Sequence, residues 1–90
     1  MTYLNVRQTV ADYDKWRLGF DANESNRRAA GATGVHHVYR DLDDPNIVSV
    51  MMEWDNADNA RRFMHDPALA EVSKKAGVIG MPERYLLEHV

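Results

Sequence analysis

The chain has 90 residues, of which 44% are hydrophobic and 28% charged, so its composition is that of a folded globular protein and not of a disordered one. Its length predicts one domain, residues 1–90, and its net charge of -3 with scattered basic residues predicts no nucleic-acid partner. The absence of cysteine excludes disulfides, thiolate nucleophiles and cysteine-bound zinc or iron-sulfur clusters.

A strand and a helix are predicted in the first third of the chain. Tyr3 to Val10 is rich in β-forming residues and alternates in polarity, which predicts the first strand. Asp12 suits an N-cap, so we expect an amphipathic helix between it and Gly31. Its inner stripe has three- and four-residue spacing and consists of Tyr13, Trp16 and Phe20, followed by Asn23 and Arg27.

A hairpin is predicted next. Val35 to Asp41 is typical of a second strand, and residues 43–46, Asp-Asp-Pro-Asn, favour a tight turn in which proline fixes φ. The strand from Ile47 to Trp54 follows, and side chains alternate across a strand. One of its faces carries Val48, Val50, Met52 and Trp54, and the other carries Ile47, Ser49, Met51 and Glu53. The first face requires a core, whereas the second is half apolar and requires partial cover.

A broken helix and a last strand complete the chain. Asp55 or Asn56 can cap a helix that ends near His65, and Asp66 with Pro67 restarts it. The apolar side of these pieces consists of Ala57, Ala60, Phe63 and Met64, then Leu69, Val72 and Ala76. Gly77 is suited to ending the helix, and the segment from Glu83 to Val90 predicts the last strand.

The expected order is strand, helix, strand, strand, broken helix, strand, which is the α+β ferredoxin-like βαββαβ pattern. In this pattern a four-stranded antiparallel sheet carries its helices on one face. The other face would expose Ile47 and Met51, with His37 or Tyr39 and Leu86 or Leu87, which is more apolar surface than a monomer normally exposes. We therefore expect a homodimer in which two sheets pack face to face.

Four segments carry a resemblance to a known family: Asp44-Pro45-Asn46, Met52-Glu53-Trp54-Asp55, Phe63-Met64-His65-Asp66-Pro67 and Ala76-Gly77-Val78. In these segments, and over nearly its whole length, the chain resembles the dimeric α/β-barrel superfamily. Within it, the chain is similar to small proteins grouped with antibiotic-biosynthesis monooxygenases and related polyketide cyclases. The resemblance implies two protomers whose sheets form a closed barrel, with a pocket in each protomer between sheet and helices.

The resemblance also implies which positions would serve a site. Trp54 matches the tryptophan that ends the third strand, which is a site residue in both the cofactorless oxygenases and the haem-degrading members. Val50, Ala60 and Ser73 stand where such relatives have the oxygenase asparagine, a tyrosine and the haem-ligating histidine. Asn5 resembles the first-strand asparagine of the haem enzymes. Because the usual haem ligand is missing, no cofactor is expected.

Five residues are candidates for a site. His37 could act as a general base, because the unperturbed imidazole pKa of ~6.5 suits proton transfer near neutrality, and Tyr39 could donate a hydrogen bond. Trp54 could stack on a planar ligand, while Asn5 and Arg7 could hold a carboxylate or phenolate. The structural alternatives are core packing for the tryptophan, a surface or barrel-lining place for the histidine, and cross-strand pairing with an acid for the other two.

Two hypotheses for function remain open at this point. The first is a small-molecule-binding protein, and possibly a cofactor-independent monooxygenase or cyclase, acting on an aromatic or polyketide-like compound in the sheet-helix cleft. The alternative is a non-catalytic dimeric module, stress-related or structural, without turnover. No metal site is expected, because the adjacent His36 and His37 point to opposite faces of a strand. No segment approaches the ~20 apolar residues of a membrane span, so we expect a cytoplasmic protein without a membrane partner.

Overall fold

All residues, 1–90, are described by a computed structural model. Its elements in chain order are β1 (Thr2–Val10), α1 (Tyr13–Ala22), α2 (Glu24–Ala30), β2 (Ala32–Arg40), β3 (Ile47–Trp54), α3 (Ala57–Met64), α4 (Pro67–Lys75) and β4 (Val78–Glu88). The strands form one antiparallel sheet in the order β2-β3-β1-β4. The expected α+β ferredoxin-like fold is therefore confirmed.

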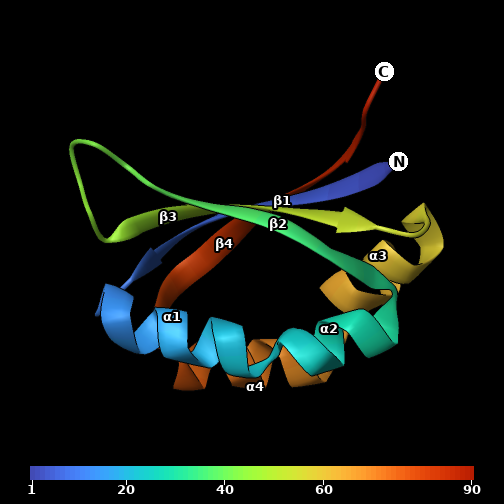
Figure 1. Ribbon diagram of the computed structural model, residues 1–90. Coiled ribbons are helices and arrows are strands. Elements are labelled where there is room, and N and C mark those ends of the chain that lie inside the picture. Colours follow the sequence, from blue (N-terminus) through green and yellow to red (C-terminus); the bar gives the residue numbers. More distant parts are fainter.

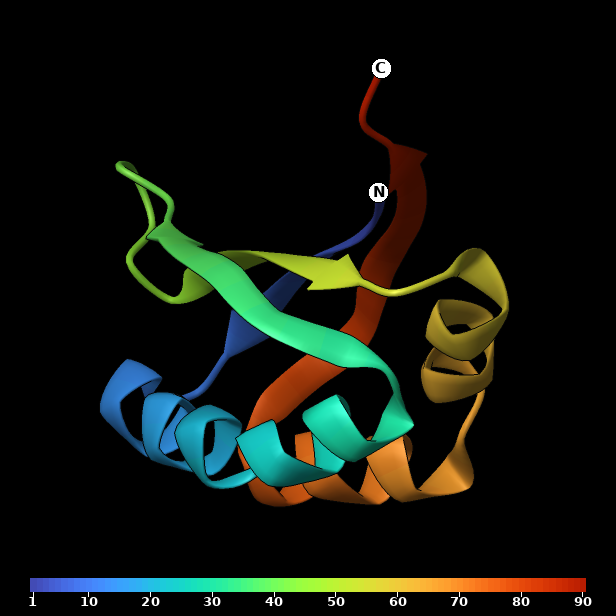
Figure 2. The same cartoon turned by 45° about the vertical axis from the view of Figure 1, so that its right-hand side comes forward.

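The helices lie on one side of the sheet, and the other side carries none (Figure 1). Figure 2 shows α1, α2 and α4 beneath the sheet and α3 beside its end. We call the covered side the helix face. The bare face is made of alternate residues of the strands: Tyr3, Asn5, Arg7, Thr9, His37, Tyr39, Ile47, Ser49, Met51, Glu53, Ile79, Glu83, Tyr85 and Leu87. None of the helices has the length and apolar character needed to cross a membrane.

The core lies between the helix face and the helices. Along β3, Val48, Val50, Met52 and Trp54 are buried, and the residues between them are half-buried. This alternation confirms that the two faces of the strand meet different surroundings. On β1, Leu4 and Val10 are buried in the same cluster, which Trp16 and Phe20 cover from α1. Each such buried side chain contributes roughly 1.5–3 kcal/mol through the removal of apolar surface from water.

Side-chain caps fix where three helices begin. A carboxylate oxygen of Asp12 accepts the backbone N–H of Lys15 at 3.3 Å, and Asp66 accepts that of Ala68 at 2.9 Å. At α3, Asn56 provides the cap, with its side-chain oxygen 2.9 Å from the backbone nitrogen of Asn59. Each cap satisfies one of the backbone donors that a helix start leaves unpaired.

The expectation of one continuous first helix is wrong, because the helix divides at Asn23. This residue ends α1 with φ of -90° and ψ of 3°, and α2 continues from Glu24. The carbonyl of Phe20 accepts the N–H of Asn23 at 3.2 Å and Nη1 of Arg27 at 2.7 Å. The arginine side chain therefore caps the break and folds under the first helix.

Two strands begin earlier than the sequence indicates. β2 starts at Ala32, ahead of Val35, and its register with β3 shifts between Ala32 and His36, where Gly34 has φ of 99°. β4 starts at Val78, ahead of Glu83, and ends at Glu88. Its register with β1 also shifts, and Gly80 in the shifted stretch has φ of 71°. Irregular stretches of this kind, on edge strands, hide the simple alternation that identifies strands in a sequence.

Candidate functional site

A cavity of about 70 Å³ lies between the helix face and the helices. Its walls are Val6, Gln8, Val50, Met52 and Arg84 from the strands, and Trp16, Gly19, Phe20, Asn23, Arg27, Phe63, Leu69, Val72, Ser73 and Ala76 from the helical layer. The chain's own side chains therefore do not fill the cleft. Pockets for drug-sized ligands have volumes of about 300–1,000 Å³, so a compound bound here must be small or must displace a helix.

Aromatic rings form the α1 side of the cavity. Trp16 and Phe20 are one helical turn apart and stack with ring centroids 5.1 Å apart and planes at 24°. The edge of His36 meets Phe20 at 5.3 Å between centroids. The α1 side of the cavity is therefore aromatic and apolar, which suits a hydrocarbon ligand.

Arg27 of α2 brings a positive charge into this apolar wall. Its side chain is 5% exposed, and its Cζ lies 3.8 Å from the centroid of the Phe20 ring, in cation-π contact. Nη1 donates to the Phe20 carbonyl, but Nη2 is buried without a hydrogen-bond partner. Burial lowers the pKa of the Arg27 guanidinium below its ordinary value, and the charges of Glu24 and Asp21 oppose this shift. Guanidinium groups stay protonated in proteins, so the charge is retained.

Arg84 of β4 reaches the same cavity from the sheet. Its Nη1 donates to the carbonyl of Met64 at 3.4 Å, while its Nε is buried and has no partner. The chain has three ion pairs, which join Arg7 to Asp41, Arg17 to Asp21 and Arg61 to Asp58. Neither cavity arginine belongs to one of them, so both carry unpaired N–H donors and no bound carboxylate.

Trp54 lies on the helix face but outside the cavity. It is 0% exposed and packs against Phe63, with ring centroids 4.9 Å apart. The indole Nε1 is buried without a partner. Phe63 stands between this tryptophan and the cavity as a member of the cavity wall, so Trp54 supports the cavity from behind.

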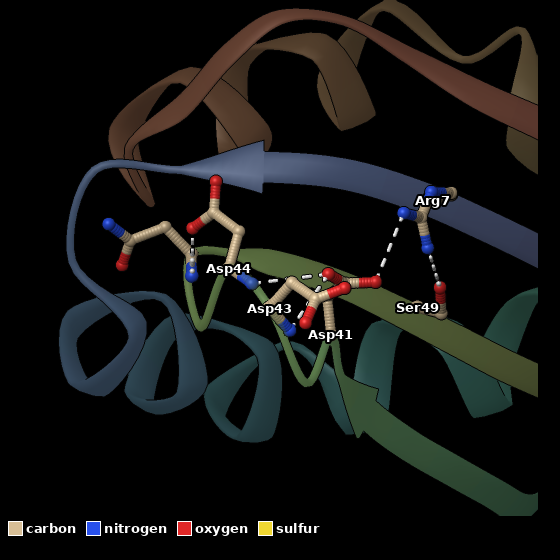
Figure 3. A network of polar contacts seen from close by, with 6 residues as sticks. Arg7, Asp41, Asp43, Asp44 and Ser49 are labelled. Carbon is tan, nitrogen blue, oxygen red and sulfur yellow. Dashed lines mark hydrogen bonds and ion pairs between the residues drawn. The ribbon is translucent and has the colours of Figure 1, made fainter.

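The other four sequence-predicted site residues lie on the bare face. Asn5 Nδ2 donates to the Val50 carbonyl at 3.2 Å. Arg7 donates from Nη1 to Ser49 Oγ at 3.4 Å and from Nη2 to Asp41 at 3.3 Å (Figure 3). Both side chains thus contact neighbouring strands or their ends, and the acid that Arg7 meets is Asp41.

His37 and Tyr39 are exposed neighbours on β2. Their rings stack with centroids 6.3 Å apart and planes at 26°. No hydrogen bond joins either side chain to another residue. The structure thus brings these two together and places them on the opposite side of the sheet from Trp54 and from the cavity.

Sequence reasoning missed the two cavity arginines as site residues. A signal for Arg27 was present, because it falls seven residues after Phe20 on the inner stripe of the predicted helix. In β4, Arg84 and Leu86 point to the same face of the sheet, opposite to Tyr85. Leu86 pairs with the buried Leu4, so this face is the helix face. Charged residues at inward positions were therefore visible, but their meeting at one cavity depends on the tertiary fold.

The side chains of the chain form no cluster that could serve as a set of metal ligands. No group of three or more histidine, cysteine, aspartate or glutamate side chains lies close enough together to hold an ion. His36 and His37, adjacent in sequence, lie on opposite faces of the sheet, with His36 against Phe20 and His37 beside Tyr39.

Comparison with known proteins finds likeness in structure but not in sequence. No protein-family model and no curated protein matches the chain. SnoaB, a cofactor-independent oxygenase from Streptomyces nogalater, superposes with a TM-score of 0.69 at 19% identity, covering 99% of this chain and 91% of its own. A proposed antibiotic biosynthesis monooxygenase from Bordetella bronchiseptica gives 0.77 at 14% identity, with 99% and 97% covered. An antibiotic biosynthesis monooxygenase gives 0.71 at 12%, with 100% and 99% covered. The chain thus has the ferredoxin-like fold of the antibiotic biosynthesis monooxygenase structures.

Proposed function

We propose that the protein binds a small, mainly apolar aromatic compound in the cavity between the helix face and the helices. The observation that carries this proposal is an unfilled cavity whose walls are mostly hydrocarbon and aromatic, and whose lining includes two arginines with unpaired N–H groups. Concave apolar sites with a few convergent polar groups are the usual form of small-molecule sites. The stacked pair Trp16 and Phe20 would give an aromatic compound an apolar, aromatic surface to contact.

A second candidate function is turnover of that compound by a cofactor-independent monooxygenase or cyclase. The fold that the chain shares with SnoaB, described as a cofactor-independent oxygenase, favours it. The cavity wall holds no histidine, carboxylate, lysine or tyrosine, and arginine is a poor base. His37 and Tyr39 would serve as proton-transfer groups only for a compound held against the bare face. Binding is therefore the better supported function, and turnover requires a substrate that needs no base in the cavity.

We also propose that the protein is a homodimer joined through the bare face. Large side chains on this face are about half exposed, with Tyr39 at 57%, Tyr85 at 51% and Leu87 at 44%. Some of its polar groups already have partners within the chain: Glu53, for example, accepts hydrogen bonds from Tyr3 and from Thr33, each at 3.0 Å. Covering the face with a second copy would remove apolar surface from water without leaving these paired groups unsatisfied.

A mass measurement tests the dimer. Light scattering at micromolar concentration should give twice the chain mass of 10.3 kDa. Leu87→Asp, on the bare face, should convert the protein to a monomer, whereas Leu18→Asp, at an exposed position of α1, should leave the mass unchanged. A monomer mass for the wild type would contradict the proposal.

A thermal-shift screen of phenols, quinones, haem and fatty acids tests binding in the cavity. A ligand at 100 times its Kd should raise the free energy of unfolding by about 2.7 kcal/mol. Ser73→Leu adds an apolar side chain to the cavity wall and should abolish the shift, whereas Ser25→Leu, exposed on α2, should retain it. If no compound shifts the transition, the non-catalytic module without a ligand becomes the better interpretation. Oxygen consumption or product formation with a compound that binds would then separate an enzyme from a binder.

A further inference from the structure

We propose that the compound bound in the cavity is an organic anion, a single aromatic ring bearing one negatively charged oxygen group that Arg27 and Arg84 hold together. This inference rests on the proposed binding function and adds the charge of the ligand. It goes beyond the fold, because it depends on two side chains that this chain places in the cavity wall.

The first step of the argument is the pairing of the buried donors. Only three buried side-chain nitrogen or oxygen atoms of the chain have no hydrogen-bond partner, and they belong to Arg27, Arg84 and Trp54. Two of the three residues line the same cavity. Because buried polar atoms nearly always have partners, two unpaired donors at one cavity indicate a missing acceptor.

The second step is charge. Neither arginine has a carboxylate partner among the ion pairs of the chain. Arg27 is also almost fully buried, with only 5% of its surface exposed. A water molecule would satisfy the N–H groups but would leave both arginines without a directly bonded anionic partner. An oxyanion would satisfy both, and guanidinium groups prefer carboxylate or phenolate acceptors because the hydrogen bonds are charge-assisted.

The third step is the shape of the ligand. The remaining walls are mostly apolar, with a stacked aromatic pair on the α1 side, so the body of the anion should be a ring without further charges. The space is about 70 Å³, below the roughly 150 Å³ of a cavity that binds benzene, so even a single ring requires the wall to move outward and a larger body would require more. None of the residues of α4 is buried, so this helix is the wall that can move outward to admit the ring.

Benzoate and benzamide test the charge directly, because they match in shape and differ in the anionic group. Isothermal titration at pH 7 should give a Kd for benzoate at least tenfold lower than that for benzamide. The wild-type Nε–H resonance of Arg84 should shift when benzoate is added, and this measurement needs no variant. Equal Kd values for the two compounds, or an unmoved Arg84 resonance with benzoate bound, would overturn the inference while leaving cavity binding in place.

Variants assign the effect to the two residues. Arg27→Gln and Arg84→Gln should each weaken benzoate binding about tenfold or more and leave benzamide binding unchanged. Arg28→Gln, exposed on the same helix as Arg27, is the matched control and should bind both as the wild type does. Arg27→Lys keeps the charge if the glutamine variant does not fold, and it should retain the preference for benzoate. If neither compound perturbs residues of the cavity wall, the proposed function fails together with this inference.

Discussion

Trp54 offers the sharpest test of whether the tryptophan of β3 is core or a ligand platform. In the core interpretation, Trp54→Ala removes a fully buried indole that packs on Phe63 and leaves a cavity behind. Such truncations cost about 3–5 kcal/mol. A domain of this size has a total stability of about 5–14 kcal/mol, so the loss takes a large fraction of it. At a urea slope of about 2 kcal/mol per molar, the unfolding midpoint should fall by about 2 M.

Trp54→Phe separates the contribution of ring packing from the free-energy cost of the unpaired indole N–H group. Phenylalanine keeps a ring against Phe63 and removes an indole Nε1 that is buried without a partner. The unpaired donor costs roughly 1–3 kcal/mol in the wild type, and its removal offsets part of the lost packing. We therefore expect Trp54→Phe to lose less than about 2 kcal/mol.

Urea unfolding followed by circular dichroism and by Trp16 fluorescence measures both variants, at one fixed protein concentration in case subunits dissociate. Leu42→Ala, at a side chain 101% exposed in the hairpin turn, is the control and should change stability by less than about 0.5 kcal/mol. The core interpretation is refuted if Trp54→Ala costs less than about 1 kcal/mol, or if the phenylalanine variant is as unstable as the alanine one.

Two further predictions concern Asp41, just after β2, and two glycines with positive φ. Hydrogen bonds from the backbone of Asp44 and from Arg7 lower the pKa of Asp41 below its ordinary value of 3.8. The folded state thus binds this proton more weakly than the unfolded state, so the carboxylate stabilises the fold above about pH 4 and that contribution is lost as the pH falls through the lowered pKa. Asp41→Asn should be less stable than the wild type at pH 7, and the difference should shrink in thermal melts below pH 4; a constant difference down to pH 2 would contradict this. Gly31→Ala should lose more than about 1 kcal/mol, because φ is 128° and the added Cβ would meet Asp55 Oδ1 at 2.7 Å. Gly80→Ala has φ of 71° but nothing within 4 Å, so it should cost less in the same melts; equal costs would show that the contact with Asp55 is unimportant.

Part of the candidate site was beyond prediction because it joins residues from distant segments. Arg27 and Arg84 come from α2 and β4, and only the packing of those elements places them at one cavity. The division of the first helix at Asn23 was also unforeseen, since no proline or glycine marks it. A local contact accompanies it: the Arg27 side chain donates to the Phe20 carbonyl, seven residues earlier, at the break.

The sequence by itself determined the fold class, the hairpin and the division of β3 into two faces. Those features follow from local periodicity, because a strand repeats every two residues and a helix every 3.6, so buried positions such as Val48 and Val50 are visible in the chain. Only the tertiary structure decided which face holds a cavity and which side chains reach it. Trp54 is a buried core residue behind the cavity wall. His37 and Tyr39 lie on the bare face, on the opposite side of the sheet from Arg27 and Arg84, whose buried N–H groups have no partner. The distances between segments and the space left between them depend on how the layers pack. The periodicity of the sequence predicts neither of these quantities.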